Sequence, residues 1–183
     1  MARSNAALPG FGAPAVGFDT PFEMLEACHE RVERSLDLLV RLCRYLHDYA
    51  CDDSARQAAR DVLRYFDVAA PLHHEDEELH VFPLLLERGS AAVVAQVQQL
   101  QADHVRMDGD WQTARTLLWA LAEGRQASFS AAEQTLLERF AEGYATHIRT
   151  EEEVIYPAAR ALMHADTLQR MGQEMRQRRG AVD

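Results

Sequence analysis

Hydrophobic residues recur along this chain at alternating spacings of three and four, which is the period of an amphipathic α-helix. The pattern runs from about residue 20 to residue 164 and is interrupted three times by short polar or glycine-containing segments. It therefore predicts four long helices, each with one buried face. Each of these faces also contains a histidine among its apolar neighbours. The four histidines are His29, His73, His104 and His147.

Capping residues mark where the first two predicted helices begin. Thr20 suits the N-cap of the first helix, with Pro21 at the first helical position and Glu23 as the capping-box partner. Residues 51–54, with the sequence Cys-Asp-Asp-Ser, offer a cap for the second helix. The first break in the pattern is therefore a short loop.

Similar signals bound the remaining helices. Gly89 follows the last residue of the second helix, Ser90 can cap the third helix and Gly124 closes it. Ser130 and Glu133 form a second predicted capping box at the start of the fourth helix. Loops this short make neighbouring helices antiparallel, so the sequence predicts an all-α, up-down-up-down four-helix bundle with the four buried faces in its core.

Two of the buried faces also carry a glutamate, Glu77 in the second helix and Glu151 in the fourth. If the helical period continues unchanged past each glutamate, the same faces extend towards the ends of these helices. The buried positions predicted there are His80, Leu84, Val154, Ala158 and Leu162.

The bundle is predicted to span residues 20–164, with a segment on either side of it. Residues 1–19 contain two prolines and three glycines without a helical period, so we expect a flexible N-terminal arm. Residues 165–183 are polar and arginine-rich and should be helical at first and frayed later. A chain of 183 residues can bury a full core without a metal, so a metal here would serve chemistry and not folding.

Charge and cysteine usage restrict the possible partners and compartment. The net charge of −10 disfavours nucleic acid and anionic membrane surfaces as partners, because both would repel the chain. Three cysteines without a Cys-x-x-Cys pair indicate neither a disulfide framework nor a zinc knuckle. The sequence also lacks a signal-peptide pattern and a stretch long enough to cross a bilayer, so we expect a cytoplasmic protein.

The potential ligands occur as an internal repeat. His29 precedes His73 by 44 residues, and His104 precedes His147 by 43 residues. The second histidine of each pair is followed four residues later by a glutamate and then by an aromatic-proline pair, in the segments HHEDEELHVFP and HIRTEEEVIYP. This repetition indicates a helix pair duplicated about a pseudo-two-fold axis.

The spacing of four places a histidine and a glutamate on the same face of one helix, about one turn apart. Both halves together then offer four imidazoles and two carboxylates to one core site. This nitrogen and oxygen set suits iron or manganese better than a metal that prefers thiolates. Glu77 and Glu151 can each bridge two metals. With an oxo or hydroxo bridge from solvent, each metal would keep a vacant position for dioxygen, nitric oxide or peroxide.

At these residues the chain resembles the hemerythrin-like HHE cation-binding family, over about residues 20–164. The resemblance implies a di-iron centre in a four-helix bundle. The implied ligands are His29, His73, Glu77, His104, His147 and Glu151. Oxygen-carrying hemerythrins have a further histidine where this chain has Asp108, and they have aspartate where it has Glu151. The closer likeness is to family members with four histidines and two glutamates, which include iron-centre repair proteins and an iron-sensing domain.

Other polar residues near the predicted ligands have more than one interpretation. His74 follows His73 and is expected to face a neighbouring helix or solvent. His80 is interpreted as a core histidine with a satisfied hydrogen bond or as a donor to a ligand. Glu33 and Asp108 lie four residues after a histidine and are either acceptors for imidazole N–H groups, ligands or solvated residues. The acidic runs around Glu77 and Glu151 are interpreted either as a solvated face or as a guide for cations.

Three residues close to the predicted site have a simpler interpretation as packing residues. Tyr144 and Trp111 lie on the buried faces of the fourth and third helices, where an aromatic ring more often packs than takes part in redox chemistry. Cys28 precedes His29 and is expected to behave as a small buried hydrophobic residue.

Three functions remain open at this point. The first is a di-iron protein that binds, senses or reduces dioxygen, nitric oxide or peroxide, with an unknown redox partner. The second is an iron-handling protein that stores or donates iron or repairs iron centres, with the acidic runs as the entry path. The third is a helical interaction domain in which the metal is structural. Absorbance bands that change when dioxygen, nitric oxide or peroxide is added would favour the first function, and rapid loss of iron to a mild chelator would favour the second.

Overall fold

The predicted helices form in the computed structural model, which describes residues 17–181, and all regular secondary structure in this range is helical. The elements form five continuous stretches, because two short π-helices join α-helices without a break. The bounds are α1 Pro21–Asp48, α2 Asp53–Asp76, η1 Glu77–Val81, α3 Phe82–Arg88, α4 Ala91–Ala122, α5 Ala131–Thr150, η2 Glu151–Ile155, α6 Tyr156–Leu162 and α7 Ala165–Arg178. The predicted N-terminal arm lies outside the described residues except for residues 17–19.

Most of the predicted caps are confirmed. The side chain of Asp52 accepts a hydrogen bond from the backbone N–H of Ala55 at 2.8 Å and caps α2. Ser130 and Glu133 form the predicted capping box of α5. Gly124 closes α4 in the left-handed conformation, with φ of 70°, which glycine adopts without strain. The loops of the bundle are therefore encoded locally.

The capping box predicted at Thr20 is wrong. The Thr20 hydroxyl instead donates to the backbone carbonyl of Gly17 at 3.3 Å, and its side chain caps no N–H of α1. The intended partner, Glu23, accepts a hydrogen bond from Arg160 of α6 at 2.7 Å. A tertiary ion pair has therefore taken the carboxylate that the local motif would have used.

The two π-helices change which residues are buried beyond each glutamate. In η1 the backbone N–H of Phe82 bonds to the carbonyl of Glu77, five residues earlier, and in η2 Tyr156 bonds to Glu151 in the same way. A proline follows the aromatic residue in both cases. Because proline has no N–H and its ring presses on the preceding turn, we attribute the wider π turn to this residue.

Each π turn contains one residue more than an α-helical turn. The buried positions predicted from a constant helical period are therefore wrong beyond each glutamate. The predicted positions His80, Leu84, Val154, Ala158 and Leu162 are only partly buried. The buried positions are each one residue further along, at Val81, Leu85, Ile155, Ala159 and Met163. The shift also turns Phe82 and Tyr156 into the core, where neither residue is exposed to solvent.

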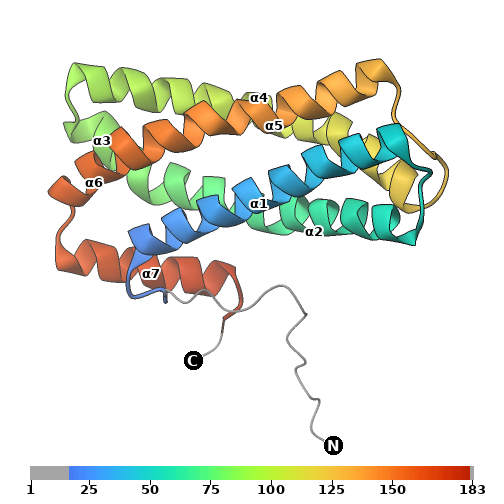
Figure 1. The fold of residues 1–183 in the computed structure, drawn as a ribbon. Helices are drawn as coiled ribbons and strands as arrows, with labels where there is room; N and C mark the ends of the chain where they lie inside the picture. Colours follow the sequence, from blue (N-terminus) through green and yellow to red (C-terminus); the bar gives the residue numbers. More distant parts are fainter. Residues whose placement is uncertain (1–16, 182–183) are drawn as a thin grey trace, which may run out of the picture.

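The long helices surround a core that is divided into two hydrophobic clusters. Helix α1 packs on α2 and α5, and α4 completes the ring by packing on both α2 and α5 (Figure 1). One cluster lies at the end of the bundle that holds the α1–α2 and α4–α5 loops. The other lies at the opposite end, near α3 and α6. Along α1, α2 and α4, the predicted histidine ligands fall between these two clusters, and on the fourth helical stretch Glu151 falls between Ile148 of the first cluster and Ile155 of the second.

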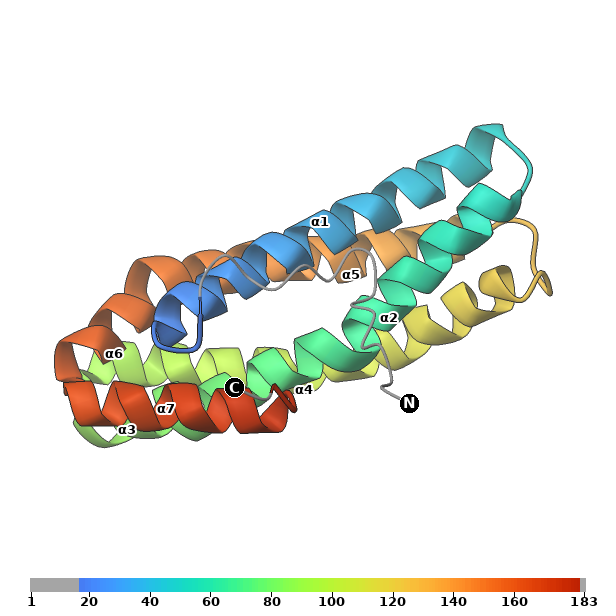
Figure 2. The ribbon, with the colours of Figure 1, turned by 90° about the horizontal axis from the view of Figure 1, so that it is seen from below.

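The C-terminal segment forms α7, which lies alongside the bundle near its α3 and α6 end (Figure 2). Met171 and Met175 are buried there in the second cluster. Gly172 is required by close packing, since a Cβ atom at this position would lie 2.0 Å from the backbone oxygen of Phe18. Arg178 at the end of α7 and Arg179 directly after it both bind the carboxylate of Asp76 on α2. None of the helices in residues 17–181 is long and apolar enough to cross a membrane.

Candidate metal centre

The six predicted ligands come together in the middle of the bundle. Helices α1, α2, α4 and α5 each provide one histidine, and η1 and η2 each begin with one glutamate. All six side chains are buried, with relative exposures between 0% and 7%. They form two groups of four that share both glutamates. One group is His29, His73, Glu77 and Glu151, and the other is Glu77, His104, His147 and Glu151.

Each glutamate contacts a histidine from each half of the repeat. Glu151 lies 2.9 Å from Nε2 of His147, which is one turn earlier in the same helical stretch, and its other oxygen lies 3.2 Å from Nε2 of His29. Glu77 lies 3.6 Å from Nε2 of His73 and 3.4 Å from Nε2 of His104. This crossed arrangement is the one in which two carboxylates can bridge two ions.

The carboxylate oxygens lack the hydrogen bonds that buried oxygens normally have. Within residues 17–181, neither oxygen of Glu151 nor Oε2 of Glu77 has a hydrogen-bond partner, although imidazole nitrogens lie within 4 Å of all three. Burying a carboxylate in this way is costly unless a cation compensates for it. These orphaned oxygens and the donor set of nitrogen and oxygen fit a bound metal cation.

Charge coupling between the two carboxylates leads to the same conclusion. Burial and the neighbouring Glu77 carboxylate raise the pKa of Glu151. Burial alone would raise the pKa of Glu77 as well, but the surrounding imidazoles outweigh it and hold that pKa well below its usual range. Without a cation the two carboxylates therefore resist carrying two negative charges together.

The four histidines divide into two pairs by the direction in which the site shifts their pKa. Burial lowers the pKa of His73 to about 3 and also lowers the pKa of His147, which keeps both imidazoles neutral with a free lone pair at neutral pH. Burial alone would lower the pKa of His29 and His104 too, but the adjacent carboxylates outweigh it and raise both. A metal cation in the site would compete with these protons for the same nitrogens.

A second pair of glutamates orients the imidazoles of α1 and α4. Nδ1 of His29 donates to Glu152 at 2.9 Å, and Nδ1 of His104 donates to Glu78 at 3.0 Å. Each of these glutamates directly follows a predicted bridging glutamate, so the arrangement repeats in both halves. A hydrogen bond from Nδ1 fixes the tautomer that leaves the Nε2 lone pair facing the site.

Sequence analysis did not single out Glu78 and Glu152, because the acidic runs that contain them are interpreted there as a solvated face or as a guide for cations. The signal was the pair of adjacent glutamates that occurs at the same place in both repeats. Asp103 was also missed. It directly precedes His104 on α4, and its carboxylate lies 3.7 Å from Nδ1 of His147.

Tyr156 is a further polar group at the site that the sequence did not indicate. Its hydroxyl donates to Oε1 of Glu77 at 2.5 Å and lies 3.2 Å from Nε2 of His29. The corresponding aromatic residue of the first half is Phe82, whose ring stacks on His104 with the centroids 5.5 Å apart. The aromatic-proline repeat was visible in the sequence, but the π turn that brings the ring into the site was not.

The remaining candidates lie outside the two groups of four. His80 Nε2 lies 2.9 Å from Arg178 of α7. Glu33 and Asp108 are exposed, so of the three interpretations offered for them the one as solvated residues holds. Tyr144 and Trp111 are buried in the first hydrophobic cluster, as the packing interpretation expected.

Two neighbours of the predicted ligands are buried to different degrees. Cys28 is buried, and burial raises the pKa of its thiol, as expected of a small hydrophobic residue. His74 is partly buried and faces the neighbouring helix α4, where its ring stacks on that of His104. The expectation that His74 faces another helix is therefore confirmed, and the contact is with a predicted ligand.

Comparison with known proteins agrees with the resemblance at these residues. The sequence profile of the hemerythrin HHE cation binding domain matches residues 20–159, which include all six predicted ligands. An uncharacterized protein of Haemophilus influenzae is 33% identical to this chain over 162 residues, which cover 88% of this chain and 91% of the relative. The chain therefore belongs to the hemerythrin HHE cation-binding domain family.

Proposed function

We propose that this protein is an antiparallel up-down-up-down four-helix bundle that holds two iron ions and binds, senses or reduces dioxygen, nitric oxide or peroxide there. The observation that carries the proposal is the sharing of Glu77 and Glu151 by two buried ligand groups. One ion would be held by His29 and His73, and the other by His104 and His147. Both glutamates would bridge the ions.

The donor set supports iron and also permits manganese. Four imidazoles and two carboxylates form a nitrogen and oxygen environment of intermediate hardness, and none of the three cysteines belongs to either group. When bound, a pair of iron ions supplies electrons for redox chemistry and open positions for small ligands. The six predicted ligands are at most 7% exposed, which favours a diatomic molecule or peroxide over a large organic substrate.

The residues of the chain itself prepare this site in three ways. The two hydrophobic clusters above and below the ligands exclude water from the carboxylates. Glu78 and Glu152 hold two imidazoles in the tautomer that faces the site. The hydroxyl of Tyr156 keeps a proton within hydrogen-bond distance of Glu77, where it can be donated to a small molecule bound nearby.

Iron handling is the second candidate, and one observation favours it. Glu78 and Glu152 contact buried histidines and are themselves 34% and 42% exposed, so each links a ligand to solvent. Carboxylates at the edge of a buried site can pass a cation between solvent and the ligands. A protein that stores or donates iron would use this route in both directions.

Metal analysis and spectroscopy test the proposal and separate the two candidates. The purified protein should contain two iron ions per chain, and the absorbance of the reduced protein should change on addition of dioxygen, nitric oxide or hydrogen peroxide. A His29→Ala variant should lose iron, whereas a His47→Ala variant, altered at an exposed position on α1, should not. Rapid and complete loss of iron to a mild chelator, with no response to the small ligands, would favour iron handling. Absence of metal from the purified and reconstituted protein would contradict both candidates.

A further inference from the structure

The two halves of the candidate metal centre correspond residue by residue, and the correspondence fails next to two of the histidines. An offset of 74 residues relates His73 to His147. The same offset relates His74, which follows the first of these histidines, to Ile148, which follows the second. One half of the repeat therefore contains an additional imidazole where the other half has an aliphatic side chain.

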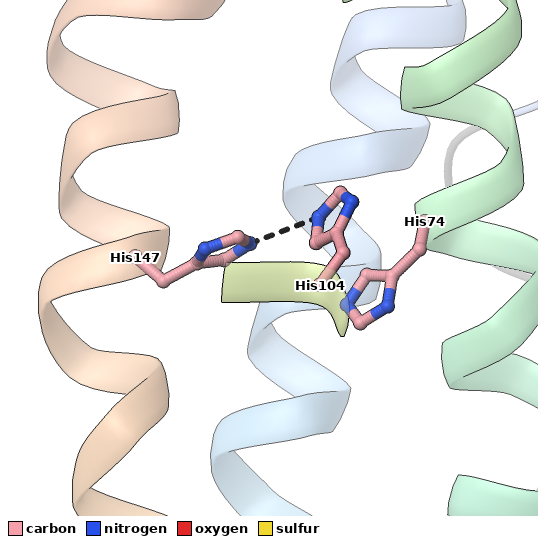
Figure 3. Close-up of side chains that lie close together, drawn as sticks. All are labelled: His74, His104 and His147. Atoms are coloured by element: carbon pink, nitrogen blue, oxygen red, sulfur yellow. Dashed lines mark hydrogen bonds between the residues drawn. The ribbon is translucent and has the colours of Figure 1, made fainter. Parts of the chain in front are cut away.

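Figure 3 shows that the additional imidazole lies beside the ligands of the second ion. His74 extends from α2 towards α4, and its ring stacks on that of His104 with the centroids 4.0 Å apart and the planes 16° from parallel. The centroid of the His147 ring is 6.0 Å away. One nitrogen from each of these three residues lies within 4.8 Å of the others.

The nitrogens of His74 have no competing protein partner in the described part of the chain. Neither ring nitrogen makes a hydrogen bond or ion pair with any of residues 17–181. The other histidines near the centre differ in this respect. Nδ1 of His104 is bonded to Glu78, and Nε2 of His80 lies close to Arg178. His74 therefore keeps a lone pair that can reach a cation.

We propose that His74 supplies a third imidazole nitrogen to the ion held by His104 and His147. The proposal rests on metal binding at the proposed centre and specifies how one of its two positions is completed. A metal–imidazole bond is about 2.1 Å long, so two nitrogens on one octahedral ion lie roughly 3 to 4 Å apart. The three nitrogens lie within 4.8 Å of one another, and because an imidazole lone pair lies in the plane of its ring, the His74 ring must turn out of its stack on His104 to bind the same ion.

The proposal makes the two metal positions chemically different. The ion held by His29 and His73 has Ile148 on the corresponding side, which offers no donor, and the hydroxyl of Tyr156 nearby. The other ion would have three imidazoles and therefore one fewer open position. A small molecule would then bind preferentially at the position with two imidazoles.

A substitution that keeps the ring but removes the nitrogens tests this role. In His74→Phe the aromatic stack on His104 is retained, whereas the donor is lost. Metal-free protein is titrated with Co²⁺ in competition with a chelator, and folding is checked by circular dichroism. Wild type should bind two ions. The variant should bind one of them on the order of 100-fold more weakly and the other unchanged. His164→Phe, altered at an exposed position before α7, serves as the matched control.

A cavity variant provides a second test if the phenylalanine disturbs the fold. Free imidazole should restore the weaker site in His74→Gly, whereas pyrrole, which has no available lone pair, should not. If His74→Phe binds both ions as tightly as wild type and imidazole has no effect on His74→Gly, His74 only stacks on His104 and this inference is wrong. If wild type itself binds no Co²⁺, the proposed metal centre is wrong as well.

Discussion

The half of the site that is built from α1, α2 and η1 and the half built from α4, α5 and η2 hold the same donors in different surroundings. Each half provides two histidines, one glutamate and a second glutamate that orients an imidazole. The neighbours differ at several related positions, and three of these pairs matter for the comparison. The pairs are His74 and Ile148, Asp76 and Thr150, and Phe82 and Tyr156.

The comparison shows that a duplicated backbone does not require two equivalent metal positions. The π turns occur at the same place in both halves and start at the two shared glutamates, so the framework is symmetric. The side chains one residue before and five residues after each glutamate are not. Asp76 is fully buried and binds α7, whereas Thr150 only donates to the backbone of its own helix. The two halves therefore share a backbone arrangement and differ in the contacts that their side chains make.

The largest expected effect comes from breaking what the two halves share. Glu151→Ala should lose both ions, because the carboxylate contacts histidines of both halves and is proposed to bridge the ions. Metal content after gel filtration measures the loss. Glu153→Ala, two residues further on and exposed, is the matched control and should keep both ions. Full metal content in Glu151→Ala would contradict the bridging role.

Replacing Tyr156 by phenylalanine makes the second half like the first, which has Phe82 at this position. Tyr156→Phe should keep both ions but slow the oxidation of the reduced protein by peroxide about 100-fold, because the proton next to Glu77 is lost. Stopped-flow absorbance measures this rate. Tyr144→Phe removes another buried tyrosine hydroxyl, one that makes no hydrogen bond to Glu77 in the described structure, and should react at the wild-type rate. Equal rates in all three proteins would show that Tyr156 only packs.

The link between α7 and the first half should contribute strongly to stability. Replacing Arg178 and Arg179 together by alanine leaves the buried Asp76 carboxylate without a partner, which costs about 3 kcal/mol when a buried pair is broken. Urea unfolding with and without metal measures the change. Thr150→Ala, at the equivalent position of the second half, should change the free energy of unfolding by less than about 0.5 kcal/mol. A double variant as stable as wild type would show that α7 is not anchored there.

The two glutamates that orient imidazoles should contribute equally to metal binding in the two halves. Glu152→Ala and Glu78→Ala should each weaken metal binding by about 10-fold to 100-fold, since each removes the acceptor of one imidazole N–H. Competition titration against a chelator measures both affinities. Glu75→Ala, at an exposed position of α2, should have no effect. If only one of the two variants binds metal more weakly, the two orienting glutamates do not have equivalent roles in the two halves.

The smallest expected effect is on secondary structure when the metal is removed. The two hydrophobic clusters extend over all the long helices and do not include the ligands, so the metal-free protein should keep its helices. Far-UV circular dichroism after treatment with a chelator should change little. A large loss of the helical signal would mean that the ions are needed for folding and would support a structural role for the metal.

The sequence predicted those features that depend on local pattern. Apolar spacing predicted the helices, and the residues that cap α2 and α5 marked where these helices start. The duplicated histidine and glutamate spacing singled out six residues that lie together in the structure. Ligand residues that repeat at helical spacing share a face whether or not the details of packing are known.

The features that the sequence missed depend on contacts between distant segments. Glu23 binds Arg160 instead of capping α1, and α7 is held by Asp76 on α2. The π turns were missed because a constant helical period was assumed beyond the glutamates. A proline after an aromatic residue in both repeats was the available sign of a wider turn. Without this shift of one residue, Tyr156 does not reach the site.

Crystals of the iron-loaded protein give the most direct test of the central claim, through anomalous diffraction at the iron absorption edge. Two iron peaks per chain are expected, both in contact with Glu77 and Glu151. One peak should lie against His29 and His73 and the other against the remaining two histidine ligands. A single peak, or iron bound only at exposed carboxylates outside the bundle core, would contradict the account.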